Sequence, residues 1–140
     1  MTPGPAVIDT NVVVSGVLTR LAVSPTARVL DAMLNGDFRF LLSIELLAEY
    51  REVLLRPKIR RRHRLSDADV EAILTEIAAD GIDLEPKRPP KERRRRGDEH
   101  LWELLAASPS AFLVTGDQRL IEEPVGGARV MTARAFVDPS

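Results

Sequence analysis

Short apolar runs that alternate with longer amphipathic segments are the feature that most constrains the fold of this chain. The runs AVI at residues 6–8 and AFLV at residues 111–114 are apolar throughout, and FRFLL at residues 38–42 ends in apolar residues. Continuous apolar strands between helices are typical of a parallel sheet that is covered on both faces. The pattern therefore predicts an α/β fold with a central parallel sheet.

Three of the amphipathic segments carry clear helix start and stop signals. Each begins after a serine that can accept hydrogen bonds from the first backbone N–H groups, and each ends at a glycine or before a proline. The segments lie at residues 25–35, 44–55 and 67–80. The first also has Pro25 at its first position and an apolar stripe that contains Val29, Leu30, Met33 and Leu34. We expect a helix in each segment.

Weaker patterns extend the alternation to the C-terminus. Two acids at the start of DEHLWELLAAS, residues 98–108, favour a helix N-terminus. We also expect a short strand in residues 82–86, a short helix at residues 118–122, a strand in residues 128–132 and a helical turn from Thr132. RPKIRRRHR at residues 56–64 and KRPPKERRRRG at residues 87–97 are expected to be surface loops.

Size and composition fit one domain. The chain has 140 residues, 44% of them hydrophobic, and no repeat or long linker, so we expect a single domain over residues 1–140. Its 20 basic and 21 acidic residues give a net charge of −1, which does not by itself indicate a nucleic-acid-binding protein. The absence of cysteine excludes thiolate metal sites and cysteine nucleophiles. No apolar run approaches the roughly 20 residues of a membrane span, and the N-terminus lacks a signal-peptide pattern, so a cytoplasmic location is expected.

Carboxylates follow two of the apolar runs. Asp9 comes directly after AVI, and Asp117 comes shortly after FLV. The carboxyl ends of parallel strands meet at one edge of a sheet, where ligands bind. Glu49 lies beside the apolar stripe of its helix, and Asp98 and Glu99 stand at the start of a later helix. We expect these acids to converge on one site.

Converging carboxylates need a cation. Like charges a few ångströms apart raise each other's pKa unless a cation neutralises them. Because the available ligands are oxygens and two histidines, Mg²⁺ or Mn²⁺ is the favoured ion. One or two such ions can activate water for phosphodiester hydrolysis. The acids therefore predict a metal-dependent nuclease.

Each acid also has a purely structural interpretation. Asp9 could hydrogen-bond the backbone of the turn that follows it. Asp117 could be the N-cap of the next helix. Glu49 could be an ordinary helix acid, and Asp98 and Glu99 could serve only the helix dipole. The functional interpretation depends on all of these acids lying together.

Four motifs stand in order along the chain, VIDTNVVVSGVL, SIELLAEYREVLLRPKI, GDEHLWELLAA and FLVTGDQRLI. Together they resemble the PIN domain family, in particular its branch of toxins from bacterial toxin–antitoxin pairs, the VapC-like ribonucleases. DTN or TGD alone is a weak signal, whereas the four motifs at these spacings are specific and cover nearly the whole chain. The resemblance implies one PIN domain with a three-layer α/β/α fold and a central parallel sheet.

The resemblance also implies a Mg²⁺- or Mn²⁺-dependent ribonuclease. The positions that match the acids of the family are Asp9, Glu49, Asp117 and either Asp98 or Glu99. Asn11 and Thr115 match polar positions that support the acids. Relatives usually have several consecutive aspartates where this chain has GDE, and residue type favours Asp98 whereas spacing from Asp117 favours Glu99. Both remain candidate metal ligands.

Two basic segments lie near the predicted acids. The segment KRPPKERRRRG at residues 87–97 lies just before Asp98. It contains the four residues that we expect to contact an RNA backbone, Arg93, Arg94, Arg95 and Arg96. A solvated loop or a partner-docking surface would have the same composition. RPKIRRRHR allows the same interpretations, with an acidic antitoxin segment as a third.

Few other residues suggest site chemistry. His63 lies within the basic run at residues 56–64, and His100 directly follows Glu99. Because a lone histidine is more often structural than a ligand, neither is assigned a role. Trp102 lies on the apolar stripe of its helix and is expected in the core rather than as a platform for a nucleobase.

The favoured hypothesis is a metal-dependent endoribonuclease that serves as the toxin of a toxin–antitoxin pair, with RNA as substrate and an antitoxin as partner. The resemblance also implies a homodimer. A second hypothesis is a PIN-like module that binds RNA or protein without cleaving, since the third acid cluster is short. A third, a phosphotransfer domain with an aspartyl nucleophile, is disfavoured because Asn11 stands where a second acid would be expected and no lysine follows Asp117.

Overall fold

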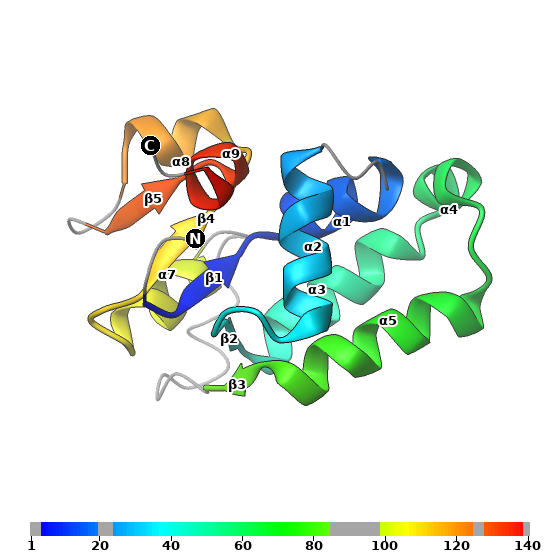
Figure 1. Cartoon of the computed structure of the whole chain (residues 1–140), viewed down its shortest axis with the longest axis horizontal. Coiled ribbons are helices and arrows are strands. Elements are labelled where there is room, and N and C mark those ends of the chain that lie inside the picture. The colour runs from blue at the N-terminus through cyan, green and yellow to red at the C-terminus, as the bar shows by residue number, and fades with distance from the viewer. Residues whose placement is uncertain (1–3, 20–23, 85–98, 125–127, 139–140) are drawn as a thin grey trace.

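The computed structural model of the chain describes residues 4–19, 24–84, 99–124 and 128–138 and shows a parallel sheet flanked by helices (Figure 1). Its strands are β1 (Ala6–Ile8), β2 (Leu41–Leu42), β3 (Ile82–Asp83), β4 (Phe112–Val114) and β5 (Arg129–Met131). They form two parallel sheets, β1-β4-β5 and β2-β3. A parallel bridge between Ala6 and Phe40 joins these sheets in the order β3-β2-β1-β4-β5. The predicted α/β fold with a central parallel sheet is confirmed.

The helices fill the intervals between these strands. They are α1 (Thr10–Thr19), α2 (Pro25–Asn35), α3 (Ile44–Leu54), α4 (Pro57–His63), α5 (Asp67–Asp80), α7 (Glu99–Ala106), α8 (Gln118–Glu122) and α9 (Ala133–Val137). The C-terminal end of β1 points toward α1 and α2, and α1 to α5 gather on that side of the molecule (Figure 1). None of the described helices is long and apolar enough to cross a membrane.

Local capping signals explain why three predicted helices begin where they do. The Ser24 side chain accepts a hydrogen bond from the backbone N–H of Ala27 at the start of α2. Ser43 and Ser66 cap α3 and α5 in the same way, and Asp69 completes a capping box at Ser66. Gly36 ends α2 in the left-handed conformation, with φ of 71°.

Both faces of the sheet are covered. Every residue of β1 and β4 is buried, as the uniformly apolar sequences predict. Phe112 of β4 lies against Phe136 of α9, with ring centroids 5.6 Å apart, while α7 packs on β1 and β4. Because side chains alternate along a strand, Leu113 faces away from Phe136. The α/β/α layers therefore follow from strands that are apolar on both faces.

Helix α1 is not predicted by its β-branched sequence. Val12, Val13, Val14 and Val17 are all buried in it. A β-branched residue costs a helix only a few tenths of a kcal/mol, whereas burying a valine contributes about 1.5 kcal/mol or more. Tertiary packing therefore outweighs the strand propensity of this segment.

The prediction of a loop at residues 56–64 is wrong, because Pro57–His63 form α4. Pro57 occupies the first helical position, where its fixed φ suits a helix and its missing N–H costs nothing. Basic side chains in the last turn, from Arg60 to His63, interact favourably with the helix dipole. The predicted loop at residues 87–97 lies outside the described residues.

Gly16 sets the distance between α1 and α2. A Cβ atom added at Gly16 would lie 2.7 Å from the carbonyl oxygen of Thr26 and 2.9 Å from the Cβ of Leu30. Contacts below 3.0 Å require the backbone of α2 to shift. The close approach of these helices therefore depends on the absence of a side chain here.

We predict that Gly16→Ala lowers the free energy of unfolding by about 1–2 kcal/mol, since the contact with α2 outweighs the gain of about 1 kcal/mol in helix propensity. Urea denaturation measures this change. Asp31→Ala, at an exposed position of α2, is the control and should leave stability nearly unchanged. A Gly16→Ala variant that is more stable than the wild type would contradict the packing argument.

Candidate active site

A cleft of about 720 Å³ opens where β1 and β4 end. Its size lies within the roughly 300–1,000 Å³ that is typical of ligand sites. Three of the predicted acids line it, Asp9, Glu49 and Asp117. The fold thus brings together, at the carboxyl ends of parallel strands, acids that are far apart in the sequence.

Helices α1 and α3 form the two walls of the cleft. Thr10, Val14 and Leu18 of α1 line it, and each lies about one helical turn from the next. Glu49 and Val53 of α3 line the opposite side with the same spacing. The cleft therefore has carboxylates at one end and apolar side chains farther along both walls.

The buried Asp9 carboxylate is held by three hydrogen-bond donors. Its Oδ1 accepts from the backbone N–H of Thr10 at 2.8 Å. Its Oδ2 accepts from the hydroxyl of Thr115 at 2.6 Å and from the side-chain amide of Asn11 at 3.2 Å. Asp9 is 7% exposed, and a carboxylate buried to this extent needs such donors to remain charged.

Asn11 and Thr115 fix the turn that carries Asp117. The backbone N–H of Gly116 donates to Asn11 Oδ1 at 2.9 Å, and the N–H of Asp117 donates to the Thr115 hydroxyl at 3.0 Å. Asn11 and Thr115, which were predicted to support the acids, therefore contact Asp9 and also orient the segment after β4.

Tyr50 anchors α3 on the end of β1. Its buried hydroxyl donates to the carbonyl oxygen of Ile8 at 2.5 Å. Burial raises the pKa of Tyr50 well above its usual value, and the nearby charges of Asp9 and Glu49 raise it further. This hydrogen bond fixes the helix position of Glu49 beside the strand end that carries Asp9.

Glu49 lies between a hydroxyl and an imidazole. Its Oε1 accepts from the Thr10 hydroxyl, and its Oε2 lies 3.4 Å from Nε2 of His100. The hydrogen bond with His100 lowers the pKa of Glu49. Burial acts to lower the pKa of His100, but the hydrogen bond and charge of Glu49, with smaller contributions from Glu45 and Asp9, raise it overall. The two groups favour a charged pair.

Asp117 combines a structural position with a place in the cleft. It caps α8, and its Oδ1 accepts from the backbone N–H of Arg119 at 3.0 Å. Its Oδ2 accepts from the Arg119 guanidinium at 2.8 Å, and this contact lowers the pKa of Asp117. The structural interpretation of Asp117 as an N-cap is thus correct, and the same side chain lines the cleft.

The remaining predicted site residues are not brought to the cleft within the described part of the chain. Asp98 and the four predicted RNA contacts, Arg93, Arg94, Arg95 and Arg96, lie outside the described residues. Glu99 begins α7 but is not among the described residues that line the cleft. Its Oε2 is buried and has no hydrogen-bond partner among the described residues.

The donor set fits a divalent cation in its chemistry. Asp9, Glu49 and Asp117 supply carboxylate oxygens, the ligands that Mg²⁺ and Mn²⁺ prefer. Within the described ranges, however, no three acids or histidines are grouped closely enough to hold a metal.

Sequence reasoning missed two features of this site. His100 contacts Glu49 from α7, and the only sequence signal was its place directly after the third acid. Arg56 and Arg62 also line the cleft, although their segment was predicted to be a loop. A helical pattern through residues 56–62 would have placed these two arginines on one face with Ile59.

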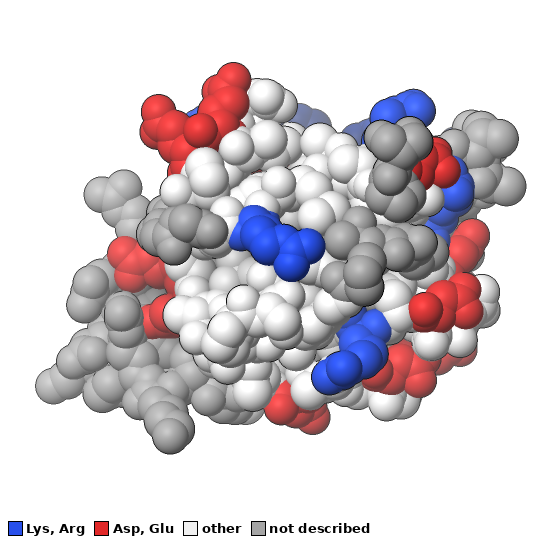
Figure 2. All heavy atoms as spheres, turned by 60° about the vertical axis from the view of Figure 1, so that its left-hand side comes forward, with Lys and Arg blue, Asp and Glu red and all other residues white. Residues whose placement is uncertain are grey.

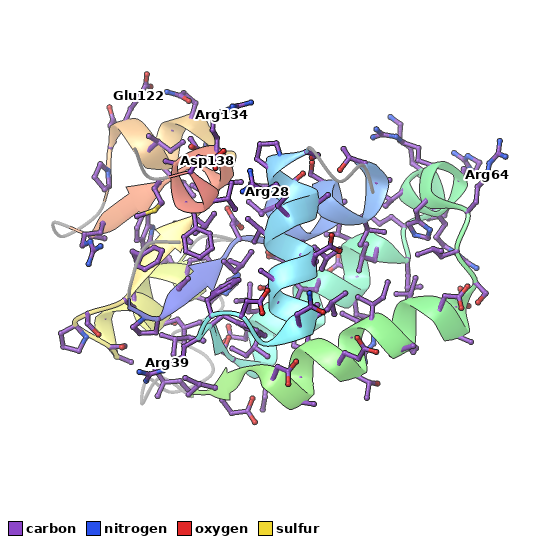
Figure 3. The ribbon with its side chains drawn as sticks, viewed as in Figure 1. Arg28, Arg39, Arg64, Glu122, Arg134 and Asp138 are labelled. Carbon is purple, nitrogen blue, oxygen red and sulfur yellow. The ribbon has the colours of Figure 1, made fainter. Side chains whose placement is uncertain are left out.

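A second cleft, of about 340 Å³, adjoins the first. Both clefts are lined by Asn11 and Ser15 of α1, and the second continues past Thr115 to Arg134 of α9. Arg134 points outward at the end of α9 (Figure 3). The two clefts therefore adjoin each other along this part of α1.

The comparisons with known proteins agree with this architecture. The family model described as PIN domain matches residues 5–119 of the 140. The matched segment contains β1, β4 and the three acids of the cleft. The comparison with curated proteins gave no match.

We predict that the interaction between Glu49 and His100 depends on pH. The lowered pKa of Glu49 stabilises the fold above its ordinary value of 4.5, and this stabilisation is lost as pH falls. The raised pKa of His100 stabilises the fold below its ordinary value of 6.5, and this stabilisation is lost as pH rises. The coupling free energy should therefore be larger near about pH 5.5 than near about pH 8.5.

A double-mutant cycle with Glu49→Gln and His100→Gln, followed by urea unfolding at both pH values, measures this coupling. Glu52→Gln, about one turn further along the cleft side of α3, serves as the control and should show no coupling to His100→Gln. An equal coupling of Glu49 and His100 at the two pH values would contradict the assignment of a charged pair.

Proposed function

Since the chain belongs to the PIN domain family, we propose that it is a metal-dependent endoribonuclease that hydrolyses RNA phosphodiester bonds. Membership in this family indicates nuclease-type activity in general. The metal dependence, the RNA substrate and the identity of the site residues are the parts that we propose.

The observation that carries the proposal is the convergence of Asp9, Glu49 and Asp117 on one cleft. These acids come from the end of β1, from α3 and from the turn after β4, so their meeting is a property of the fold rather than of local sequence. Carboxylates that meet at a ligand-binding edge are the arrangement expected of a phosphoryl-hydrolysing metal site.

The residues of the chain would orient and neutralise the site. Asp9, Glu49 and Asp117, with Asp98 or Glu99, would hold the cation. Asn11 and Thr115 keep Asp9 oriented through their hydrogen bonds. His100 keeps Glu49 in its charged form by lowering its pKa. When Mg²⁺ or Mn²⁺ is bound, it would activate water and offset charge on the phosphate.

The proposal of cleavage within a chain draws on the smaller cleft that adjoins the larger one. Asn11 and Ser15 line both clefts, and the acids line the larger one. A nucleic acid seated at the acids could extend past these two residues into the smaller cleft. This added room supports binding of a chain rather than of a single nucleotide.

The biological setting is proposed from the family resemblance. We propose that the protein is the toxin of a toxin–antitoxin pair, acts in the cytoplasm, binds an antitoxin and forms a homodimer. A PIN-like module that binds RNA or protein without cleavage is the second candidate. It is favoured by the short acid cluster GDE at residues 97–99.

We predict that Asp9→Asn and Asp117→Asn each reduce Mn²⁺-dependent cleavage of single-stranded RNA by roughly 100-fold or more, because loss of a metal ligand should cost at least as much as loss of an outer-shell partner. Cleavage of a labelled RNA by the purified protein measures this. Asparagine is also a good N-cap, so a purely structural Asp117 would tolerate the change with activity intact.

Asp31→Asn is the matched control, since Asp31 is exposed on α2 away from the cleft. It should cleave like the wild type, and circular dichroism should show that all three variants are folded. Undiminished cleavage by both cleft variants would refute the proposed site.

A separate prediction concerns metal binding. Titration of the wild type with Mn²⁺ in a calorimeter should show binding, and Glu49→Gln should weaken it by about tenfold or more. Glu76→Gln, an exposed substitution on α5, should bind like the wild type. A wild type that binds no Mn²⁺ would support the non-cleaving module instead.

A further inference from the structure

We infer that Arg56 and Arg62 form a phosphate-binding pair that holds the backbone of the nucleic acid in the acid cleft. The inference rests on the proposed function and deepens it, because it assigns substrate positioning to α4. Arg56 directly precedes α4, and Arg62 lies in its last turn. The predicted RNA contacts at residues 93–96 are separate from this pair.

Both arginines line the cleft that contains Asp9, Glu49 and Asp117. Helix α4 packs against α1 and α3, the two helices that form the walls. The cleft is therefore acidic where the strands end and basic where α4 closes it. The Arg56 charge also contributes to lowering the pKa of Glu49, so the two ends of the cleft influence each other electrostatically.

The helical phase of α4 separates two sets of cations. Arg56, Ile59 and Arg62 lie about one turn apart and line the cleft. Lys58 and Arg61 are exposed and are not among the residues that line it. The segment therefore contains two pairs of cations: Arg56 and Arg62 line the cleft, whereas Lys58 and Arg61 do not.

Packing does not account for the arginines on the cleft side of α4, although Arg62, in the last turn, also interacts favourably with the helix dipole. No residue of α4 is buried. Arg60 forms an ion pair with Asp67 at 2.6 Å, which links α4 to the start of α5. This ion pair gives Arg60 a structural role, whereas Arg62 lines the cleft.

The partner of Arg56 is weakly held. Its guanidinium donates to Glu52 at 2.9 Å, and the side chains are 56% and 67% exposed. An exposed pair one turn apart on a helix contributes little to stability. A phosphate oxygen could therefore replace Glu52 with little loss, and Glu52, which also lines the cleft, acts as a competitor for Arg56.

Apolar side chains lie along the cleft between its acidic and basic ends. Val14 and Leu18 line it from α1, and Val53 and Ile59 line it from α3 and α4. A nucleotide combines a phosphate with an apolar base face, so both its parts find a matching surface here. An arginine guanidinium also matches phosphate geometry through paired hydrogen bonds.

An acidic polypeptide is the competing ligand for these arginines. The family's nuclease-type activity requires a phosphodiester backbone at the acids, and the arginines lie in that same cleft. This continuity favours nucleic acid. Arg64 projects outward at the far end of α4 (Figure 3). On the face shown in Figure 2, the basic group near the centre lies among uncharged side chains.

The experiment compares two double variants with the same change in charge. Binding of a short fluorescein-labelled single-stranded RNA is measured by anisotropy in Ca²⁺, and cleavage is measured separately in Mn²⁺. Arg56→Gln with Arg62→Gln should weaken binding by about tenfold or more and raise KM with little change in kcat. Lys58→Gln with Arg61→Gln should change binding by less than about threefold.

Salt dependence gives a second readout. Loss of two phosphate contacts to a single strand should make the slope of log Kd against log salt concentration shallower by roughly 1.4 for the cleft-facing pair. The outward-facing pair should keep the slope of the wild type. In addition, Glu52→Gln should tighten RNA binding, since it frees Arg56 from its competitor.

Equal effects of the two double variants would overturn the inference, because they would show that α4 attracts RNA only through its overall positive charge. Binding of poly-L-glutamate that depends on Arg56 and Arg62, with RNA binding that does not, would also overturn it in favour of an acidic protein. A wild type that binds RNA through these arginines but never cleaves it would uphold the pair and refute the proposed nuclease.

Discussion

The structure of the site depends on satisfying one buried carboxylate with hydrogen bonds. Asp9 sits between β1 and α1, and its hydrogen bonds to Thr10, Asn11 and Thr115 join that junction to the end of β4. Removing a carboxylate from water is costly unless such donors replace it. The same contacts therefore fix the edge of the sheet and aim an acid into the cleft. Tyr50 brings the second acid to this edge through its hydrogen bond to Ile8.

The sequence predicts elements whose signals are local. The serine caps of α2, α3 and α5 act within their own first turns, and Gly36 needs only its own backbone freedom. Helix α1 was missed because its valines are helical only through burial against other elements. Helix α4 was missed because it buries no residue and so has no apolar periodicity. In each case, the missing information lies in the packing.

In the candidate site, too, some features could be predicted from the sequence and others depend on packing. Asp9 and Asp117 could be predicted to meet because both follow strands that turned out to be adjacent and parallel. The structural interpretations of these acids were also correct, since Asp9 accepts from the Thr10 backbone and Asp117 caps α8. The contact of His100 with Glu49 could not be predicted, because it depends on how α7 lies against α3. A capping or turn position and a place in a site are thus compatible roles for one carboxylate.

Helices α1 and α4, which both line the cleft, differ in how freely their sequences can change. On α1, Gly16 meets the backbone of α2, and most of the helix is buried, so a substitution there disturbs the core. On α4, no residue is buried, and a substitution at one of its exposed positions leaves the core intact. Divergence among relatives, or selection in the laboratory, can therefore retune what the cleft accepts through α4 while the acids stay in place. The fold therefore constrains the sequence of α1 and the acids strongly and the sequence of α4 only weakly.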